Sequence, residues 1–279
     1  MTSASSETVP SLTYKTTASC HLKPRVSLKT SITHPINVSW IVPDDLISGL
    51  SMESLPETID LFDIYTNDSL YQYYYYEPAE RLVRNPQHSR PTNYGNLALS
   101  SCPGKKVRLN GPVRGRASID RDLDLDFQRL KSLDISVIIC CLTDEELAFL
   151  GASWPKYCEF AQRHDLQIIR IPMIEGGCPE SIDQMDQVII QIEHHIKQGR
   201  NILAHCRGGI GRAGLVACCW LLKTRYCFDA DRAIRFVRMR RSPKAIETMQ
   251  QVDFIMQYAN YIHWQFQQSS TNHMTHQAH

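Results

Sequence analysis

A cysteine and an arginine stand at the two ends of a glycine-rich stretch, "HCRGGIGRAG", at residues 205–214. Glycines allow consecutive backbone N–H groups to point the same way, and such a row of amides binds anions. The planar guanidinium of Arg212 suits two phosphate oxygens at once. The same positive surroundings favour the thiolate form of Cys206, which is the nucleophilic form of cysteine. These residues predict attack of a thiolate on phosphorus, followed by hydrolysis of the phosphorus–sulfur bond.

The glycine-rich stretch lies between a predicted strand and a predicted helix. In sheets of parallel strands, ligands bind at the carboxyl ends of the strands, and the next helix adds positive charge from its N-terminus. Apolar runs and amphipathic segments alternate along most of the chain, which predicts an α/β fold with a central, mainly parallel sheet flanked by helices. We expect strands at 35–42, 96–104, 135–142, 166–174 and 201–206, and helices at 120–134, 154–165, 179–199, 214–227, 229–241 and 247–266.

The 279 residues divide into three predicted parts. Residues 1–33 are rich in serine and threonine without periodicity, so we expect them to be disordered. Residues 34–267 are expected to form one catalytic domain, with an insertion at about 50–92 that reads as a long loop with one short helix. The polar residues 268–279 are expected to form a flexible tail.

The composition narrows the class of protein. A net charge of +1 gives no indication of a nucleic-acid partner. The chain has neither an apolar leader nor a run of eighteen apolar residues, so we expect no membrane association and a location in the cytoplasm, the nucleus or both. The histidines lack metal-ligand spacing, and the loop itself supplies positive potential, so neither a metal nor another cofactor is expected.

Several segments resemble a known family. The spacing of Cys206 and Arg212 matches the signature of the cysteine-dependent protein tyrosine and dual-specificity phosphatases. Over roughly residues 34–265, the chain resembles the cyclin-dependent-kinase-associated phosphatases, in "PINVSW", "LALSSCPGKKVR", "IPMIEGGCPE", "HCRGGIGRAGLVA" and "AIETMQQVDFI". The resemblance implies a dual-specificity phosphatase fold and a phosphorylated protein as substrate, with a cyclin-dependent kinase as candidate partner. The tyrosine-recognition elements of larger phosphatases are missing, which implies a shallow site that also accepts phosphoserine and phosphothreonine.

The resemblance also assigns roles to individual residues. Cys206 is the implied nucleophile, and Arg212 binds the phosphate and stabilises the transition state. His205 tunes the thiolate through hydrogen bonding. The backbone amides that line the phosphate cradle are those of Arg207, Gly208, Gly209, Ile210 and Gly211.

Three positions depart from the family pattern. Glu175 stands where the family has the aspartate that acts as general acid, and we expect it to fill that role, with Glu180 and Asp183 as alternatives. Ala213 replaces a serine or threonine whose hydroxyl helps the sulfur to leave, which predicts a slow second step. Glu247 replaces a glutamine that helps to place water, a role that we expect Glu247 or Gln250 to take.

The sequence is also compatible with two other functions. The three departures also fit a pseudophosphatase, which binds phosphorylated protein without turnover. A phosphoinositide phosphatase is the other alternative. Arg207 is the only cationic residue inside the loop besides Arg212, and the absence of a lysine pair weakens the phosphoinositide interpretation.

Overall fold

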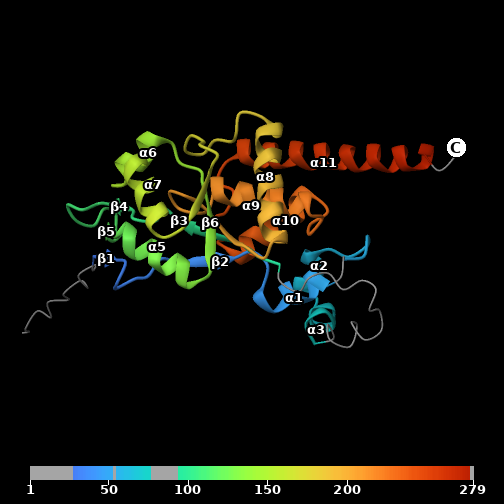
Figure 1. The fold of residues 1–279 in the computed structure, drawn as a ribbon, viewed down its shortest axis with the longest axis horizontal. Coiled ribbons are helices and arrows are strands. Elements are labelled where there is room, and N and C mark those ends of the chain that lie inside the picture. The colour runs from blue at the N-terminus through green and yellow to red at the C-terminus, as the bar shows by residue number, and fades with distance from the viewer. Residues whose placement is uncertain (1–27, 53–54, 77–93, 277–279) are drawn as a thin grey trace, which may run out of the picture.

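A five-stranded sheet lies at the centre of the computed structural model, which describes residues 28–52, 55–76 and 94–276 (Figure 1). The strand order is β2-β3-β8-β6-β7, with β2 antiparallel to β3 and the other neighbours parallel. The predicted fold class, a mainly parallel sheet flanked by helices, is therefore confirmed. The strands are β2 (Val38–Trp40), β3 (Leu97–Ser101), β6 (Ile135–Cys140), β7 (Gln167–Arg170) and β8 (Asn201–Cys206).

β8 is the middle strand, and it ends at Cys206. It pairs with β3 on one side and β6 on the other, so that Cys206 lies opposite Ser101. Residues 202–206 are all buried, as the uninterrupted apolar run predicts for a strand with both faces covered. The cysteine thus lies at the carboxyl edge of the sheet, at the end of its middle strand.

Helices cover both faces of the sheet (Figure 1). α5 and α7 pack together beside β6 and β7, whereas α9 lies against β8 and β3 and is surrounded by α8, α10 and α11. Because α9 is enclosed on every side, its residues from Arg212 to Leu222 are all buried. The helices are α5 (Leu123–Ser132), α6 (Asp144–Phe149), α7 (Trp154–Arg163), α8 (Ile182–Lys197), α9 (Arg212–Lys223), α10 (Ala230–Arg240) and α11 (Met249–His276).

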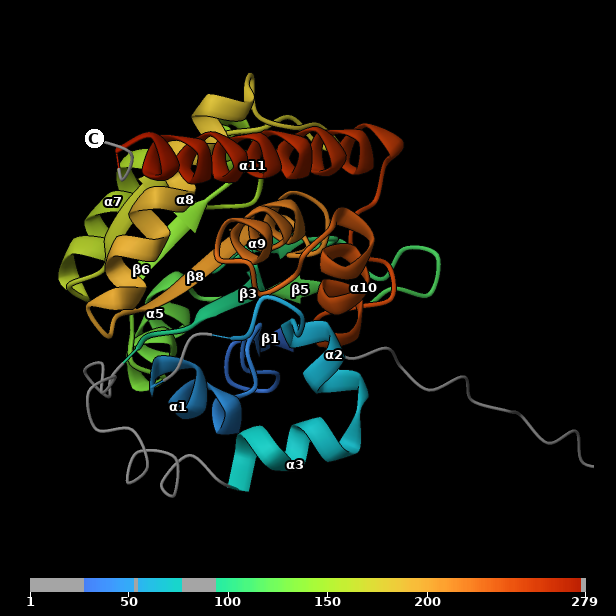
Figure 2. The same cartoon turned by 90° about the vertical axis from the view of Figure 1, so that its right-hand side faces the viewer.

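Three further helices precede β3, and they lie below α10 in Figure 2: α1 (Asp44–Met52), α2 (Leu61–Thr66) and α3 (Asp68–Tyr76). The expectation of a long loop with one short helix at 50–92 is wrong for residues up to 76, which contain the end of α1 and all of α2 and α3. Residues 77–93 lie outside the described part of the chain. Asp60 explains the helical start of α2, because it caps the helix and exchanges hydrogen bonds with Asp63 in a capping box. Arg232 of α10 binds Asp60 at 2.8 Å and attaches these helices to the domain.

A second, small sheet was not expected. It has the order β1-β5-β4, formed by β1 (Lys29–Thr30), β5 (Ile119–Asp120) and β4 (Lys106–Val107). The disorder expected for residues 1–33 is thus wrong at β1, and residues 1–27 lie outside the described part.

The end of the chain also differs from the prediction. α11 continues to His276, although the sequence predicts a flexible tail from 268, because no glycine or proline interrupts residues 249–276. In the part of the chain that the structure describes, no helix is both long and apolar enough to cross a membrane.

Candidate active site

The nucleophile candidate lies at the bottom of the loop that follows β8. Cys206 is 2% exposed, and the backbone N–H of Gly209 donates a hydrogen bond to its Sγ at 3.2 Å. This contact shows that at least one loop amide points at the sulfur.

The carbonyls of four successive loop residues, 207–210, are all hydrogen-bonded to groups outside the loop. Four successive residues each accept a hydrogen bond from outside the loop: Arg207 O from Lys105 Nζ (3.0 Å), Gly208 O from Arg241 Nη2 (3.3 Å), Gly209 O from Arg241 Nε (2.9 Å) and Ile210 O from the Ile246 N–H (3.2 Å).

Outward carbonyls imply inward amides. In a trans peptide the C=O and the following N–H point in opposite directions, and the described residues contain no cis peptide. We therefore infer that the amides from Gly208 to Gly211 face the cradle, and for Gly209 the contact with Sγ shows this directly. Such a ring of fixed dipoles can hold the oxygens of a phosphate.

Gly209 is required by close contact as well as by its backbone angle. Its φ is +71°, and a Cβ at this position would lie 2.0 Å from the carbonyl oxygen of Ser100 on β3. Any side chain here would push the loop away from the sheet. The glycine therefore lets the loop pack directly on the neighbouring strand.

Arg212 begins α9 and is held by two neighbours. Its Nη1 donates to Glu146 Oε2 (2.5 Å) and to the Met173 carbonyl (2.7 Å), and its Nη2 donates to Glu146 Oε1 (2.9 Å). The side chain is 3% exposed, so the guanidinium has a fixed position at the cradle.

Glu146 was not among the predicted site residues, although its local sequence predicts the start of a helix. Thr143 and Glu146 form a capping box at the start of α6. A threonine followed three residues later by a glutamate is a sequence pattern that predicts such a helix start. The pairing with Arg212 becomes visible only when β6 and β8 lie side by side.

Glu175 lies at the rim of the cradle in a tight turn. The Gly177 N–H donates to the Ile174 carbonyl, and Thr248 Oγ1 binds the Gly176 carbonyl at 2.8 Å. Both carboxylate oxygens of Glu175 accept from Nη1 of Arg207, at 3.0 and 3.3 Å. Of the three carboxylates considered from the sequence, Glu175 is the one bonded to a loop residue, whereas Glu180 and Asp183 are exposed at the start of α8.

Two apolar side chains flank the same rim. Phe149 is 73% exposed, and the Arg207 guanidinium lies 6.0 Å from the centre of its ring. Ile174, next to Glu175, is 71% exposed. Exposed apolar side chains therefore lie on both sides of the Arg207–Glu175 pair.

Glu247 and a glutamine lie beside Gly211, but the glutamine is not the expected one. A Cβ on Gly211 would lie 2.2 Å from Glu247 Oε2 and 3.2 Å from Gln251 Nε2. Gln251 is fully buried and donates to the Gly177 carbonyl, whereas Gln250 is exposed. Gln251 and not the predicted Gln250 therefore lies at the loop, because one residue along a helix turns the side chain by about 100°.

His205 is buried beside the cysteine and is electrically neutral. Its Nε2 lies 2.8 Å from the Tyr157 hydroxyl, and burial lowers the pKa of His205 to about 3. Burial also raises the pKa of Tyr157, so the phenol keeps its proton. The imidazole therefore supports the end of β8 without carrying charge.

The buried histidine predicts a loss of stability in acid. In the unfolded chain the pKa of His205 returns to about 6.5, so below that pH the unfolded state binds a proton that the folded state does not. Between pH 6.5 and 3, this group should lower the free energy of unfolding by about 1.4 kcal/mol per pH unit. Urea denaturation of wild type and His205→Gln should differ by that slope. The exposed His263→Gln is the control, and an unchanged slope in His205→Gln would contradict the prediction.

A central parallel strand that ends in a cysteine, a loop of inward amides and a buried guanidinium together define the class of cysteine-dependent phosphatases. Residues 124–261 match the family described as "Dual specificity phosphatase, catalytic domain". The chain therefore contains a dual specificity phosphatase catalytic domain. The family resemblance seen in the sequence is confirmed.

Curated relatives and solved structures agree with this assignment. Cyclin-dependent kinase inhibitor 3 of Homo sapiens is 29% identical over 164 residues, which are 59% of this chain and 70% of that protein. The Rattus norvegicus protein of the same name is 28% identical over the same shares. The crystal structure of kinase associated phosphatase, with its catalytic-site cysteine replaced by serine, has a TM-score of 0.53 and 25% sequence identity, covering 65% of this chain and 92% of that one.

Proposed function

We propose that this protein hydrolyses phosphomonoesters on protein side chains, phosphotyrosine as well as phosphoserine and phosphothreonine, through a cysteinyl-phosphate intermediate. The single observation that carries the proposal is the Gly209 N–H directed at Cys206 Sγ, within a loop whose carbonyls are held outward. This arrangement gives a nucleophile and an oxyanion site in the same cradle.

In the first step, Cys206 Sγ attacks the phosphorus of the ester. The S–P bond forms while the bond from phosphorus to the substrate oxygen breaks. The amides from Gly208 to Gly211 and the guanidinium of Arg212 hold the other phosphate oxygens. The carboxylic acid of Glu175, 65% exposed at the rim, gives its proton to the leaving alcohol.

In the second step, water attacks the phosphorus of the cysteinyl phosphate. Glu175, now a carboxylate, takes a proton from the water as the new P–O bond forms. The S–P bond breaks, the electron pair returns to Cys206 as a thiolate, and inorganic phosphate leaves. Glu247 and Gln251, at Gly211, are the side chains that we assign to placing the water.

Ala213 makes the second step the slower one. It lies fully buried in the first turn of α9. The family resemblance implies at this position a serine or threonine hydroxyl that donates to the departing sulfur. Ala213→Ser should therefore raise kcat about tenfold, the size of one hydrogen bond to a charged atom.

Rapid mixing with excess p-nitrophenyl phosphate tests the proposal. We expect a burst of about one nitrophenol per enzyme, followed by slower release, because cysteinyl phosphate accumulates. Peptide mapping of enzyme quenched in denaturant should locate the phosphate on Cys206. If neither this ester nor a phosphothreonine peptide gave product or phosphoenzyme, the catalytic proposal would be overturned.

Ala213 also favours one second candidate, a pseudophosphatase that binds phosphorylated protein. The Ala213→Ser variant separates the two. A rise in turnover supports a slow enzyme, whereas no turnover in either form, with phosphopeptide binding retained, supports the binding function.

The protein substrate follows from the relatives. Their names refer to cyclin-dependent kinases and to association with a kinase. We therefore propose a phosphorylated protein kinase of that class as the first protein substrate to test, by release of phosphate from its phosphothreonine or phosphotyrosine.

A further inference from the structure

Lys105 contacts the phosphate loop from outside. It lies in the turn between β3 and β4, and its Nζ donates to the Arg207 carbonyl at 3.0 Å. Among the described residues, this is the only hydrogen bond of its ammonium group, and no carboxylate pairs with it. Burial lowers the pKa of Lys105, although the neighbouring thiols of Cys102 and Cys206 oppose that shift. Burying part of a lysine costs free energy, and one backbone acceptor is little compensation, which indicates a role of this contact in the loop.

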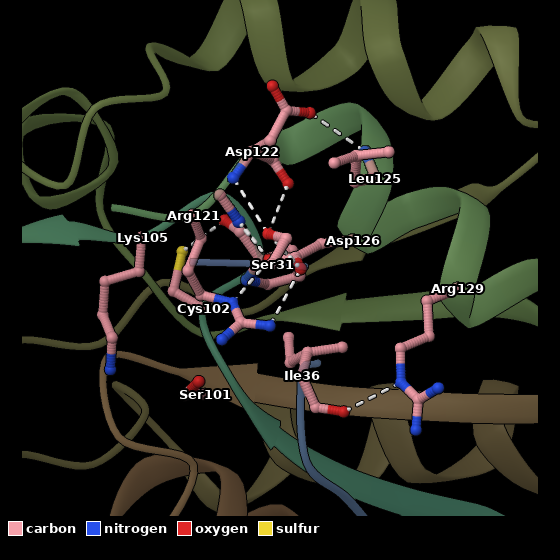
Figure 3. A network of polar contacts seen from close by, with 12 residues as sticks. Ser31, Ile36, Ser101, Cys102, Lys105, Arg121, Asp122, Leu125, Asp126 and Arg129 are labelled. Carbon is pink, nitrogen blue, oxygen red and sulfur yellow. Dashed lines mark hydrogen bonds and ion pairs between the residues drawn. The ribbon is translucent and has the colours of Figure 1, made fainter. Parts of the chain in front are cut away.

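The backbone that carries Lys105 is fixed by a buried ion pair. Arg121 binds both oxygens of Asp126, at 2.8 and 3.0 Å, and the two side chains are 8% and 1% exposed. Asp126 also accepts from the Gly104 N–H at 2.9 Å and from Ser31 Oγ at 2.8 Å, and the Arg121 N–H donates to the Lys105 carbonyl. In Figure 3 the Lys105 side chain extends away from this network. Its base is therefore rigid, and its ammonium is directed at the loop.

The bond from Lys105 sets the direction of one particular peptide. With the Arg207 carbonyl held outward, the Gly208 N–H of the same peptide must face the cradle. Arg241 binds the next two carbonyls in the same way, at Gly208 and Gly209. The Gly209 N–H, which follows the Gly208 carbonyl, does reach Sγ. Lys105 thus donates a hydrogen bond to the first carbonyl of the loop, as Arg241 does to the next two.

We propose that Lys105 is a positioning residue of the phosphate cradle, which holds the Gly208 amide toward the phosphate through the Arg207 carbonyl. The inference deepens the proposed function and rests on it for the reaction, but its binding part can be tested without turnover. Without Lys105, the first peptide of the loop is free to rotate, and the cradle loses one aligned donor.

The test is tungstate affinity, with tungstate as a stable oxyanion, measured for Lys105→Met, Lys105→Arg and Lys106→Met. Lys106 is the matched control, because it is the next residue and pairs with Asp120 instead of the loop. We expect Lys105→Met to raise the Kd of tungstate about tenfold and to lower kcat/KM for p-nitrophenyl phosphate by a similar factor. Lys105→Arg should restore both, since a guanidinium can donate to the same carbonyl, and Lys106→Met should change neither more than twofold.

Two results would overturn the proposal. One is a tungstate Kd for Lys105→Met equal to that of Lys106→Met. The other is an equal loss in the methionine and arginine variants, which would indicate packing alone. If Lys105→Met does not fold, Lys105→Ala replaces it, because alanine also lacks a side-chain donor. A tungstate Kd equal to that of wild type in Lys105→Ala would then contradict the proposal. A wild type that binds tungstate but gives neither product nor phosphoenzyme from p-nitrophenyl phosphate or a phosphothreonine peptide would defeat the proposed function. The comparison of tungstate affinities among the Lys105 variants would still test the role of Lys105.

Discussion

Replacing Arg212 with lysine should lower kcat/KM for a phosphomonoester by about 10³-fold. A guanidinium has five N–H groups, and three of those of Arg212 are taken by Glu146 and the Met173 carbonyl. Both hydrogens of Nη1 and one of Nη2 are used. Among the described residues, no acceptor binds the Nε hydrogen or the second Nη2 hydrogen, and these two lie along one edge of the group. That edge can hold two phosphate oxygens at once.

Lysine cannot reproduce this geometry, because its three donors radiate from one atom. It can pair with Glu146 or with the phosphate, but it cannot bridge both. Steady-state kinetics with p-nitrophenyl phosphate give the measurement. Arg129→Lys is the control, because Arg129 is an exposed arginine of α5 that donates to the Ile36 carbonyl and not to the loop, and kcat/KM should stay within twofold. A loss of less than tenfold in Arg212→Lys would mean that the phosphate is held elsewhere.

Replacing Glu175 with glutamine should separate good leaving groups from poor ones. An alkoxide is a poor leaving group, so a phosphothreonine peptide depends on a proton from the acid, and kcat/KM should fall by about 10²- to 10³-fold. Nitrophenolate leaves readily without a proton, so for p-nitrophenyl phosphate the loss should be smaller by at least about tenfold. The ratio of the two losses is the measurement.

Glu180→Gln provides the matched control for Glu175→Gln. Glu180 is exposed a few residues later and contacts Gln184 through its backbone, without a bond to Arg207. It should leave both substrates unaffected. Equal losses for both leaving groups in Glu175→Gln would show that this carboxylate binds substrate and does not donate the proton.

The parts of the fold that sequence predicts well are those with long apolar runs. β6 and β8 are buried on both faces, so "ISVIIC" and "NILAHC" carry a strong signal. The cysteine, the loop and the arginine follow one another within seven residues, so their proximity needs no tertiary information. These local features explain why the sheet and the centre of the site were predictable.

Features that depend on distant contacts were not predictable. The strands of the small sheet have two residues each, which is too short for an alternating pattern. Lys105 and Glu146 lie 102 and 66 positions from the loop residues that they bind, and nothing in their local sequence indicates those partners. The choice between Gln250 and Gln251 depends on which face of α11 points at the loop. That face is set by the contacts of Thr248 and Gln251 with Gly176 and Gly177, which the sequence does not indicate.

The inward amides also determine where selectivity must reside. Main-chain N–H groups are the same whatever residue carries them, so the cradle recognises a tetrahedral oxyanion and little else. The cradle holds the product phosphate through the same donors as the ester. It makes no contact that distinguishes one peptide sequence from another. If the proposed function holds, the choice among phosphoproteins is therefore left to the side chains at the rim, Phe149, Ile174 and Arg207. A change of substrate can evolve there without disturbing the chemistry below.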